Sequence, residues 1–419
     1  MVNFMIKKIL IMVCAFCVIL SLFTSCKDTN NDDVDEKDEA VDEVTDTNET
    51  DTEEDASDFD DGEADDSDIN EGTKDELEFY GSEGLEYFVI EYGETCAVSG
   101  MGTCADTDII IPPIAPDGSK VVAIDSYCFV GCETIESVTL HSGIQEIGSS
   151  AFSGCTSLKE IVFAEDGLEK IGGAAFERCT SLEEITIPDS VKELKTAAFS
   201  ECSSLNSIAL GKGITELTST FSRCTALESI VIPGNVLEVN RVFEYCSSLE
   251  EVVFSEGVTC VGDSAFYECD SLVNVTFPDT LTEIGSGTFI GCDLLGEIVI
   301  PDSVTVIGTK AFWYCSGLSS VTLGTGLTEI ADFAFSDSGI AEIAIPDGVE
   351  VVGSAAFSSC KSLKKVHIPK SVNTIADLAF NASQYIEEVY YAGSESDWNA
   401  VSIGEYNEPL TEAEIIFAE

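Results

Sequence analysis

The chain has 419 residues and a formal net charge of −59, from 78 acidic against 19 basic side chains. A surface this acidic repels phosphate backbones and anionic lipid headgroups, so the composition argues against nucleic-acid binding. Hydrophobic residues make up 44% of the chain, which is enough for a large buried core. The expected partners are neutral or cationic: glycans, proteins with basic patches, or divalent cations.

Residues 1–25 have the features of an export signal. Lys7 and Lys8 precede an apolar run over residues 9–23, which is shorter than the ~20 residues needed to span a bilayer. The run ends in Phe23-Thr24-Ser25-Cys26, which resembles the bacterial lipobox, with Phe in place of the usual Leu. That resemblance implies cleavage before Cys26 and a diacylglycerol on its thiol. The alternative is ordinary signal cleavage beside an incidental cysteine.

Residues 26–83 are predicted to be a disordered acidic linker. Residues 27–78 hold 26 Asp and Glu, three Lys and almost no large apolar side chains, so they cannot bury enough surface to offset the entropy of ordering. The acids from Asp58 to Gly62 do not form a calcium loop, because Ser57 and Phe59 stand where that loop needs acids. We therefore expect a solvated stalk.

Residues 84–120 are predicted to form an N-terminal capping module. Leu85, Tyr87 and Val89, and later Ile109 and Ile111, alternate with polar residues around glycine-rich breaks. This alternation is typical of short strands in a hairpin.

A repeat of 22 to 24 residues then fills residues 121–391. Each unit is marked by one phenylalanine, at positions 129, 152, 176, 199, 221, 243, 266, 289, 312, 335, 357 and 380. A cysteine follows three residues later, at positions 132, 155, 179, 202, 224, 246, 269, 292, 315 and 360, with Ser338 and Ser383 in the other two units.

The residue types within one unit predict its structure. Leu-x-x-Ile-x-Ile, as in residues 182–187, has a period of two and β-branched side chains, so it predicts a strand with one buried face. Proline often follows and ends the ladder. The Ala-Phe-x-x-Cys part has helical spacing and predicts a short turn of helix on the opposite wall.

One such unit cannot close a core by itself, so the units must stack. The predicted fold is a solenoid: a leucine-rich-repeat right-handed superhelix of 12 repeats, mainly parallel β with short helical turns. Two consecutive units are one residue shorter between Leu217 and Phe221 and between Val239 and Phe243. We expect a local change of curvature there.

This string of residues resembles the BspA-type leucine-rich repeat of bacterial cell-surface proteins. Residues 96–112 resemble the leading module of such proteins, and residues 392–419, with Asp397-Trp398-Asn399, resemble their C-terminal cap. The resemblance implies a surface-exposed protein associated with adhesion. It supplies no ligand and no catalytic residues.

The cysteines outside and inside the repeat are interpreted differently. The ten repeat cysteines form a column of parallel side chains, which predicts small buried hydrophobic residues rather than metal ligands or disulfides. Cys96 and Cys104 flank a glycine-rich turn, so a disulfide between them is plausible, as is its absence. Cys128 and Cys260 are expected to be buried singly.

The sequence indicates neither catalysis nor a bound metal or cofactor. His141 and His367 are the only histidines and lie about ten units apart, so they cannot share a triad or a zinc site. Trp398, with Tyr390, Tyr391 and Tyr406, either closes the open end of the core or offers an aromatic platform to a glycan, and we favour the cap.

The outward face of the predicted sheet is the candidate binding surface. Small residues such as Thr139 and Val162 lie between the two core aliphatics of each strand. A row of glutamates precedes them: Glu160, Glu184, Glu251, Glu297, Glu342 and Glu388. They predict a docking face for a basic or extended partner, or simply keep the face soluble.

The most consistent interpretation is an exported, monomeric binding protein that presents its solenoid for adhesion or for protein or glycan recognition. It would be anchored on the extracellular face and would contact the membrane only through the lipid on Cys26. The alternative is a structural envelope or matrix scaffold without a specific ligand.

Overall fold

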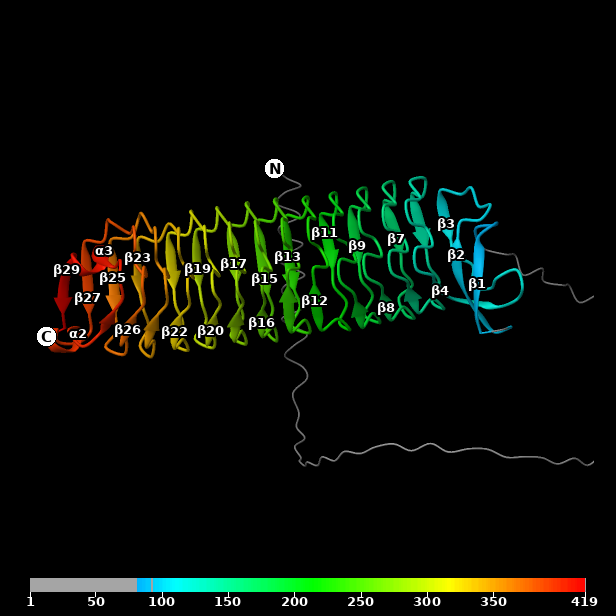
Figure 1. The fold of residues 1–419 in the computed structure, drawn as a ribbon. Coiled ribbons are helices and arrows are strands. Elements are labelled where there is room, and N and C mark those ends of the chain that lie inside the picture. The colour runs from blue at the N-terminus through cyan, green and yellow to red at the C-terminus, as the bar shows by residue number, and fades with distance from the viewer. Residues whose placement is uncertain (1–80, 92, 419) are drawn as a thin grey trace, which may run out of the picture. The chain divides into compact units, whose positions relative to one another are not determined.

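The computed structural model describes residues 81–91 and 93–418, which form a solenoid with two strands in each turn (Figure 1). The expected signal peptide, Cys26 and nearly all of the linker lie outside these residues. Ser82, which was expected to belong to the linker, is buried, and its N–H donates to the carbonyl of Ile110 over 2.8 Å. The folded part therefore includes residues 81–83.

The first column of strands carries the predicted Ile-x-Ile element, and its members run parallel. These strands are β3 (Asp108–Ile110), β5 (Ser137–Thr139), β7 (Glu160–Val162), β9 (Glu184–Thr186), β11 (Ser207–Ala209), β13 (Ser229–Ile232), β15 (Glu251–Phe254), β17 (Asn274–Thr276), β19 (Glu297–Val299), β21 (Ser320–Thr322), β23 (Glu342–Ala344), β25 (Lys365–Ile368), β27 (Glu388–Tyr391) and β29 (Glu414–Phe417).

A second column of short strands, not expected from the sequence, follows the proline turn. Its members are β4 (Lys120–Ile124), β6 (Glu146–Ile147), β8 (Lys170–Ile171), β10 (Glu193–Leu194), β12 (Glu216–Thr218), β14 (Glu238–Asn240), β16 (Cys260–Val261), β18 (Glu283–Ile284), β20 (Val306–Ile307), β22 (Glu329–Ile330), β24 (Val351–Val352), β26 (Thr374–Ile375) and β28 (Ser402–Ile403).

Glycine follows several of these second strands, where it is favoured by close packing rather than by its backbone angle, although Lys195, Ala331 and Ala376 occupy the same position in other units. A Cβ on Gly308 would lie 2.5 Å from the backbone nitrogen of Ser286 in the preceding unit.

The solenoid is confirmed, but it is longer than twelve repeats. The described residues form about 14 turns, because β3 pairs in parallel with β5 and β29 pairs in parallel with β27. Each terminal module thus contributes a solenoid turn without the marker phenylalanine. The sequence pattern missed these turns because it was recognised by that residue.

The predicted helical turn around each phenylalanine is wrong. In the unit of Phe176, both Ala174 and Arg178 have a positive φ, of 54° and 60°. The N–H groups of Ala174, Phe176 and Arg178 donate to carbonyls of the next unit over 2.8–3.0 Å. Left-handed residues on each side of the phenylalanine turn every second N–H along the solenoid axis. The segment therefore makes these backbone hydrogen bonds to the next unit, whereas a helix would make them within itself.

The core consists of side-chain columns that run through the whole stack. All twelve marker phenylalanines have an exposed fraction of 0%, and neighbouring rings lie 5.0–6.0 Å apart and nearly parallel. Nine of the ten repeat cysteines are buried beside them, and Cys132 is partly exposed. The prediction that the phenylalanine and cysteine side chains of the repeat face the core is confirmed.

The two shortened units change the local spacing. The ring centroids of Phe199 and Phe221 lie 5.7 Å apart and those of Phe221 and Phe243 6.0 Å, against 5.0–5.5 Å between the other successive marker rings. In both units the second strand, β12 or β14, is three residues long. The predicted curvature change itself stays a prediction.

The N-terminal end is closed by an antiparallel hairpin, as expected. Strand β1 (Glu86–Glu91) pairs with β2 (Thr95–Gly100), and β2 pairs in parallel with β4. The C-terminal end carries two short helices, α2 (Glu395–Trp398) and α3 (Glu408–Thr411). No helix in the described part of the chain has the length and apolar character needed to cross a membrane.

Candidate functional site

The six predicted glutamates all occupy the first position of a first-column strand. Five of them are exposed, and Glu388 is partly buried. Within a strand successive side chains alternate between faces, and the second residue of each strand points into the core. The glutamates and the residues two positions on, such as Val162 and Val299, therefore share the outward face, as the sequence predicted.

The strand register shows that these glutamates do not form a continuous stripe. Ser207 lies beside Glu184, Ser229 and Asn274 flank Glu251, and Ser320 lies beside Glu297. At ~4.8 Å per strand, Glu184 and Glu251 are about 14 Å apart. Glu160 and Glu184 lie on neighbouring strands, whereas small polar side chains separate Glu184, Glu251 and Glu297 from one another.

Two of the six glutamates are engaged within the protein. Glu342 lies 2.7 Å from Nε2 of His367, and Glu388 forms an ion pair of 2.8 Å with Lys365. Glu388 also accepts a hydrogen bond of 2.5 Å from the hydroxyl of Tyr390. These contacts hold the pKa of Glu388 below its ordinary value, and the hydrogen bond from Lys365 is the largest cause.

Glu160, Glu184, Glu251 and Glu297 have no ion-pair partner among the described residues. These four carboxylates, hereafter the acidic row, are available to a partner.

A second line of carboxylates was missed in the sequence. Its members are the first residues of second-column strands: Glu146, Glu193, Glu216, Glu238, Glu283 and Glu329. Its signal was a glutamate followed directly by Ile, Leu or Val in the second half of these units. Three of these carboxylates have partners, because Lys170 pairs with Glu146, Lys195 pairs with Glu193, and Asn240 donates to Glu238.

The plausible disulfide between Cys96 and Cys104 is not formed in the structure, where both thiols are free. Cys96 lies in β2 with an exposed fraction of 1%, because its side chain faces the core. Cys104 follows the turn at Gly102 and is partly exposed. Cys128 is buried as expected, whereas Cys260 in β16 is only partly buried.

The two histidines lie in separate units, as the sequence required. Nδ1 of His141 accepts from the backbone N–H of Gly143 over 3.0 Å, and His367 lies on the outward face of β25. Among residues 81–91 and 93–418, no three His, Cys, Asp or Glu side chains gather as a metal site would require.

The terminal aromatic residues divide into two groups. Trp398 and Tyr391 are buried, with ring centroids 5.1 Å apart, so they close the core as predicted. Tyr390 instead stacks on His367, with ring centroids 4.6 Å apart and an interplanar angle of 5°. Tyr406 is exposed and belongs to neither group.

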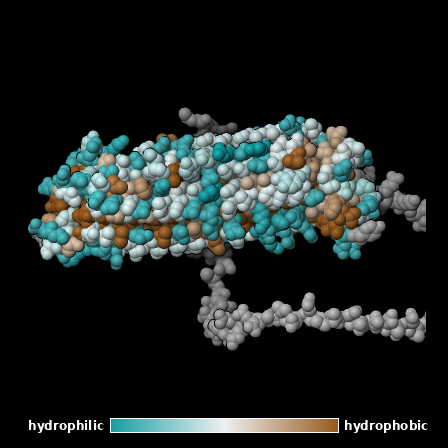
Figure 2. Space-filling model, viewed as in Figure 1, coloured by the Kyte–Doolittle hydropathy of each residue, from teal (hydrophilic) through white to brown (hydrophobic). Residues whose placement is uncertain are grey.

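Most of the visible surface is hydrophilic or neutral, with apolar spots scattered over it (Figure 2). One apolar area gathers at the end formed by β1, where Phe88, Val89 and Ile90 are exposed by 60%, 41% and 54%.

Two solved structures share this fold, and a third is less similar. A leucine-rich repeat protein from Bacteroides ovatus has a TM-score of 0.54 at 24% identity, over 80% of this chain and 99% of that one. The pneumococcal vaccine antigen PcpA has a TM-score of 0.51 at 21% identity, over 81% and 98%. A leucine rich cell surface protein from Faecalibacterium prausnitzii has a TM-score of 0.43 at 24% identity, over 79% and 99%. No curated protein matches the chain.

The repeat itself identifies the family. The family model of the BspA type leucine rich repeat region matches residues 122–242, 239–340 and 288–399, which together span more than half of the chain. The marker phenylalanines and the cysteine column fall within these ranges. The chain therefore belongs to the BspA-type leucine-rich-repeat family.

Proposed function

We propose that this chain is an exported, lipid-anchored binding protein that docks a basic partner along the first strand column, as an adhesin does. The observation that carries the proposal is the acidic row. Its four carboxylates point outward from regularly spaced strands and have no ion-pair partner in the described residues. Spaced charges on a rigid repeat suit an extended partner with basic side chains, and they steer its approach.

The central units strengthen the electrostatic argument. Residues 242–309 contain 12 acidic residues and neither lysine nor arginine. Glu251 and Glu297 lie in this stretch. A basic partner would therefore meet attraction that no positive charge of the same units offsets.

The test is a binding screen of the full chain, purified in detergent, against arrays of proteins and glycans. The proposal expects one saturable basic protein partner whose affinity falls as salt rises. The triple variant Glu184→Gln, Glu251→Gln and Glu297→Gln should weaken binding by about tenfold, at about 0.5 kcal/mol for each exposed pair.

The matched control makes the same change of charge on the second column, as Glu216→Gln, Glu283→Gln and Glu329→Gln. This control should bind normally. Equal losses in the two triple variants would remove the acidic row from the proposal and leave only a general charge effect.

Anchoring is tested separately in cells. Cys26→Ser should abolish incorporation of labelled fatty acid and release the protein from the membrane fraction. Proteinase added to intact cells should degrade the wild-type protein if the solenoid is displayed outside. Normal anchoring of the Cys26→Ser variant would contradict the lipid attachment.

A scaffold is the second candidate function, and the exposed end strand favours it. In the described residues β1 hydrogen-bonds to β2 alone, and its Phe88, Val89 and Ile90 are exposed. An apolar edge of this kind can pair with another copy of the chain. Concentration-dependent self-association that is lost in Phe88→Lys, with no saturable partner on the arrays, would support the scaffold.

A further inference from the structure

We infer that a hollow at the C-terminal end of the first strand column binds a neutral glycan through a wall built on His367 and Tyr390. This site lies apart from the acidic row and does not depend on the function proposed for that row. Of the terminal aromatic cluster, Trp398 is buried in the cap and does not line the hollow, whereas the buried Tyr391 contributes to its lining.

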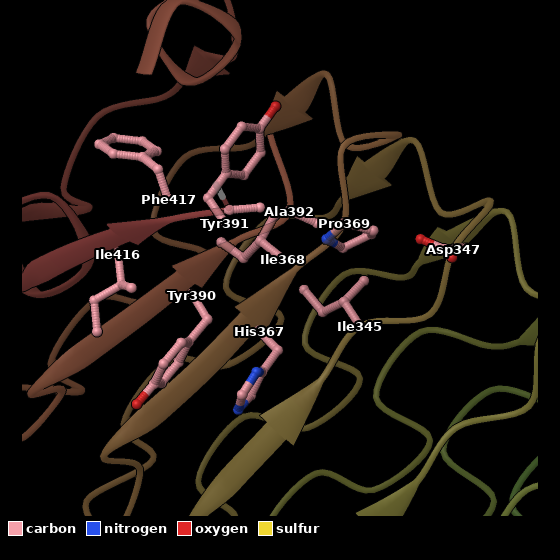
Figure 3. A pocket seen from close by; sticks show the side chains of 11 residues that line it. Ile345, Asp347, His367, Ile368, Pro369, Tyr390, Tyr391, Ala392, Ile416 and Phe417 are labelled. Carbon is pink, nitrogen blue, oxygen red and sulfur yellow. The ribbon is translucent and has the colours of Figure 1, made fainter. Parts of the chain in front are cut away.

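The hollow crosses four adjacent strands and has a volume of about 310 Å³. Strands β23, β25, β27 and β29 are hydrogen-bonded in register, which places His367 beside Tyr390 and Tyr390 beside Ile416. These three side chains point to the same side in Figure 3. Pro369, Phe417 and Asp347 also line the hollow. It therefore offers a largely apolar surface that runs across the strands.

The two rings are held in place before any ligand arrives. His367 and Tyr390 stack on each other, Glu342 bonds Nε2 of the histidine over 2.7 Å, and Glu388 accepts from the tyrosine hydroxyl over 2.5 Å. Fixed rings lose little side-chain entropy on binding. Earlier strands of the column have Thr, Val, Ala or Ile in the same row, so the pair is particular to this end of the stack.

The charges around the hollow favour a neutral ligand. Four of the 19 Lys and Arg residues lie in residues 361–370, and three of them pair with carboxylates of the following turn. Lys364 pairs with Glu387, Lys365 with Glu388 and Lys370 with Asp397, over 2.8–3.0 Å. The surroundings are thus nearly balanced, in contrast to residues 242–309, so a basic peptide gains less here than at the acidic row.

The chemistry of a pyranose sugar matches this apolar lining and its nearly balanced surroundings. Its apolar C–H faces can pack on Tyr390 and Ile416, while its hydroxyls can donate to the carboxylate of Asp347. Small-molecule sites typically occupy ~300–1,000 Å³ and combine an apolar lining with a few polar groups. A hollow at the lower end of that range suits one or two sugar rings of a longer chain.

The experiment is a glycan array followed by titration of the best neutral glycan against the full chain in detergent. His367→Thr and Tyr390→Thr place at these positions the residue found in the same row at Thr186, Thr276 and Thr322, so the fold should persist. Each variant should lower affinity by about tenfold, which corresponds to ~1.4 kcal/mol. Val299→Thr, in the same row far from the hollow, is the control and should bind normally.

Salt and the acidic-row variant separate this site from the proposed function. Glycan affinity should stay constant between about 50 and 500 mM salt, and the triple Glu→Gln variant should bind the glycan normally. The inference is overturned if no neutral glycan binds, or if Tyr390→Thr binds it as well as the wild type. It is also overturned if a basic peptide occupies the hollow in a salt-sensitive way. None of these results alters the test of the acidic row.

Discussion

The thiol of Cys269 donates a hydrogen bond of 3.1 Å to the carbonyl oxygen of Phe243, one unit earlier in the stack. The same oxygen accepts the N–H of Cys246, so both of its lone pairs are used. Nine buried cysteines make this contact over 3.0–3.3 Å. Ser383 makes it to Phe357 over 2.6 Å. The column therefore selects a small side chain that can donate.

Replacing Cys269 tests this requirement. Cys269→Ser keeps a donor of similar size, whereas Cys269→Ala removes the donor and leaves a small cavity. We expect the alanine variant to be less stable than the serine variant by about 1 kcal/mol, measured from the urea midpoint. Cys104, which is partly exposed, provides the control: its Ser and Ala variants should not differ. An alanine variant at 269 as stable as the serine variant would remove the donor role.

The buried thiols also predict sensitivity to alkali. Burial raises the pKa of Cys155, Cys202 and Cys246 to about 12. The unfolded thiols lose their protons near pH ~8.5, so the folded state binds more protons between that pH and 12. The stability from these thiols is complete below pH ~8.5 and is lost as the pH rises toward 12.

Circular dichroism between pH 7 and 12 should therefore show unfolding that begins well below the pKa of the folded thiols. At pH 8, a thiol reagent should modify the partly exposed Cys104, Cys132 and Cys260 in the native protein and spare the eleven buried cysteines. Rapid modification of all fourteen described thiols in the native state would contradict the burial argument.

The sequence predicted the features marked by the same residue type in every unit, and it missed those that different residue types form. The spacing of Phe129 to Phe380 revealed the stack, because every member occupies the same buried place. The second strand column remained hidden, since a two-residue strand such as Glu283–Ile284 has no period of its own. The left-handed residues were hidden as well, because residues as different as Ala174, Lys310 and Leu378 adopt that conformation.

The sequence predicted which face of the sheet carries the glutamates, but not which of them form ion pairs or hydrogen bonds within the protein. Alternation placed the glutamates outward correctly. Which carboxylates are engaged depends on the register between units, and this register brings Lys365 beside Glu388 and His367 beside Tyr390. Neither contact follows from one unit read alone, because each joins residues of different units.

Two alanines of one turn test the left-handed positions. Ala382 is exposed and has a φ of 59°, a conformation that costs an L-residue ~1–2 kcal/mol. Ala379 is fully buried next to Phe380. Ala382→Gly should stabilise the protein by about 0.5 kcal/mol, because the relief of strain exceeds the entropy that glycine adds to the unfolded chain. Ala379→Gly should destabilise it by about 1.5 kcal/mol, because it removes a buried methyl group. Equal effects in urea unfolding would contradict this reading.

Asp397 ties the C-terminal cap to the last repeat. Its carboxylate accepts from the N–H and hydroxyl of Ser394 over 3.0 and 2.8 Å, and from Lys370 over 3.0 Å. The hydrogen bond from the backbone of Ser394 is the largest cause that lowers the pKa of Asp397 to about 2. The unfolded pKa is ~3.9, so the stabilisation is complete above that pH and is lost as the pH falls through 2.

The buried Trp398 reports on this cap, because Asp397 precedes it in α2. In a Trp313→Phe background, which leaves Trp398 as the only tryptophan, its fluorescence should shift to the red between pH 4 and 2 as the cap loosens. Asp397→Asn cannot ionise and should remove this step, while it weakens the cap at neutral pH because the ion pair with Lys370 is lost. A step that persists in Asp397→Asn would assign the acid transition to another carboxylate.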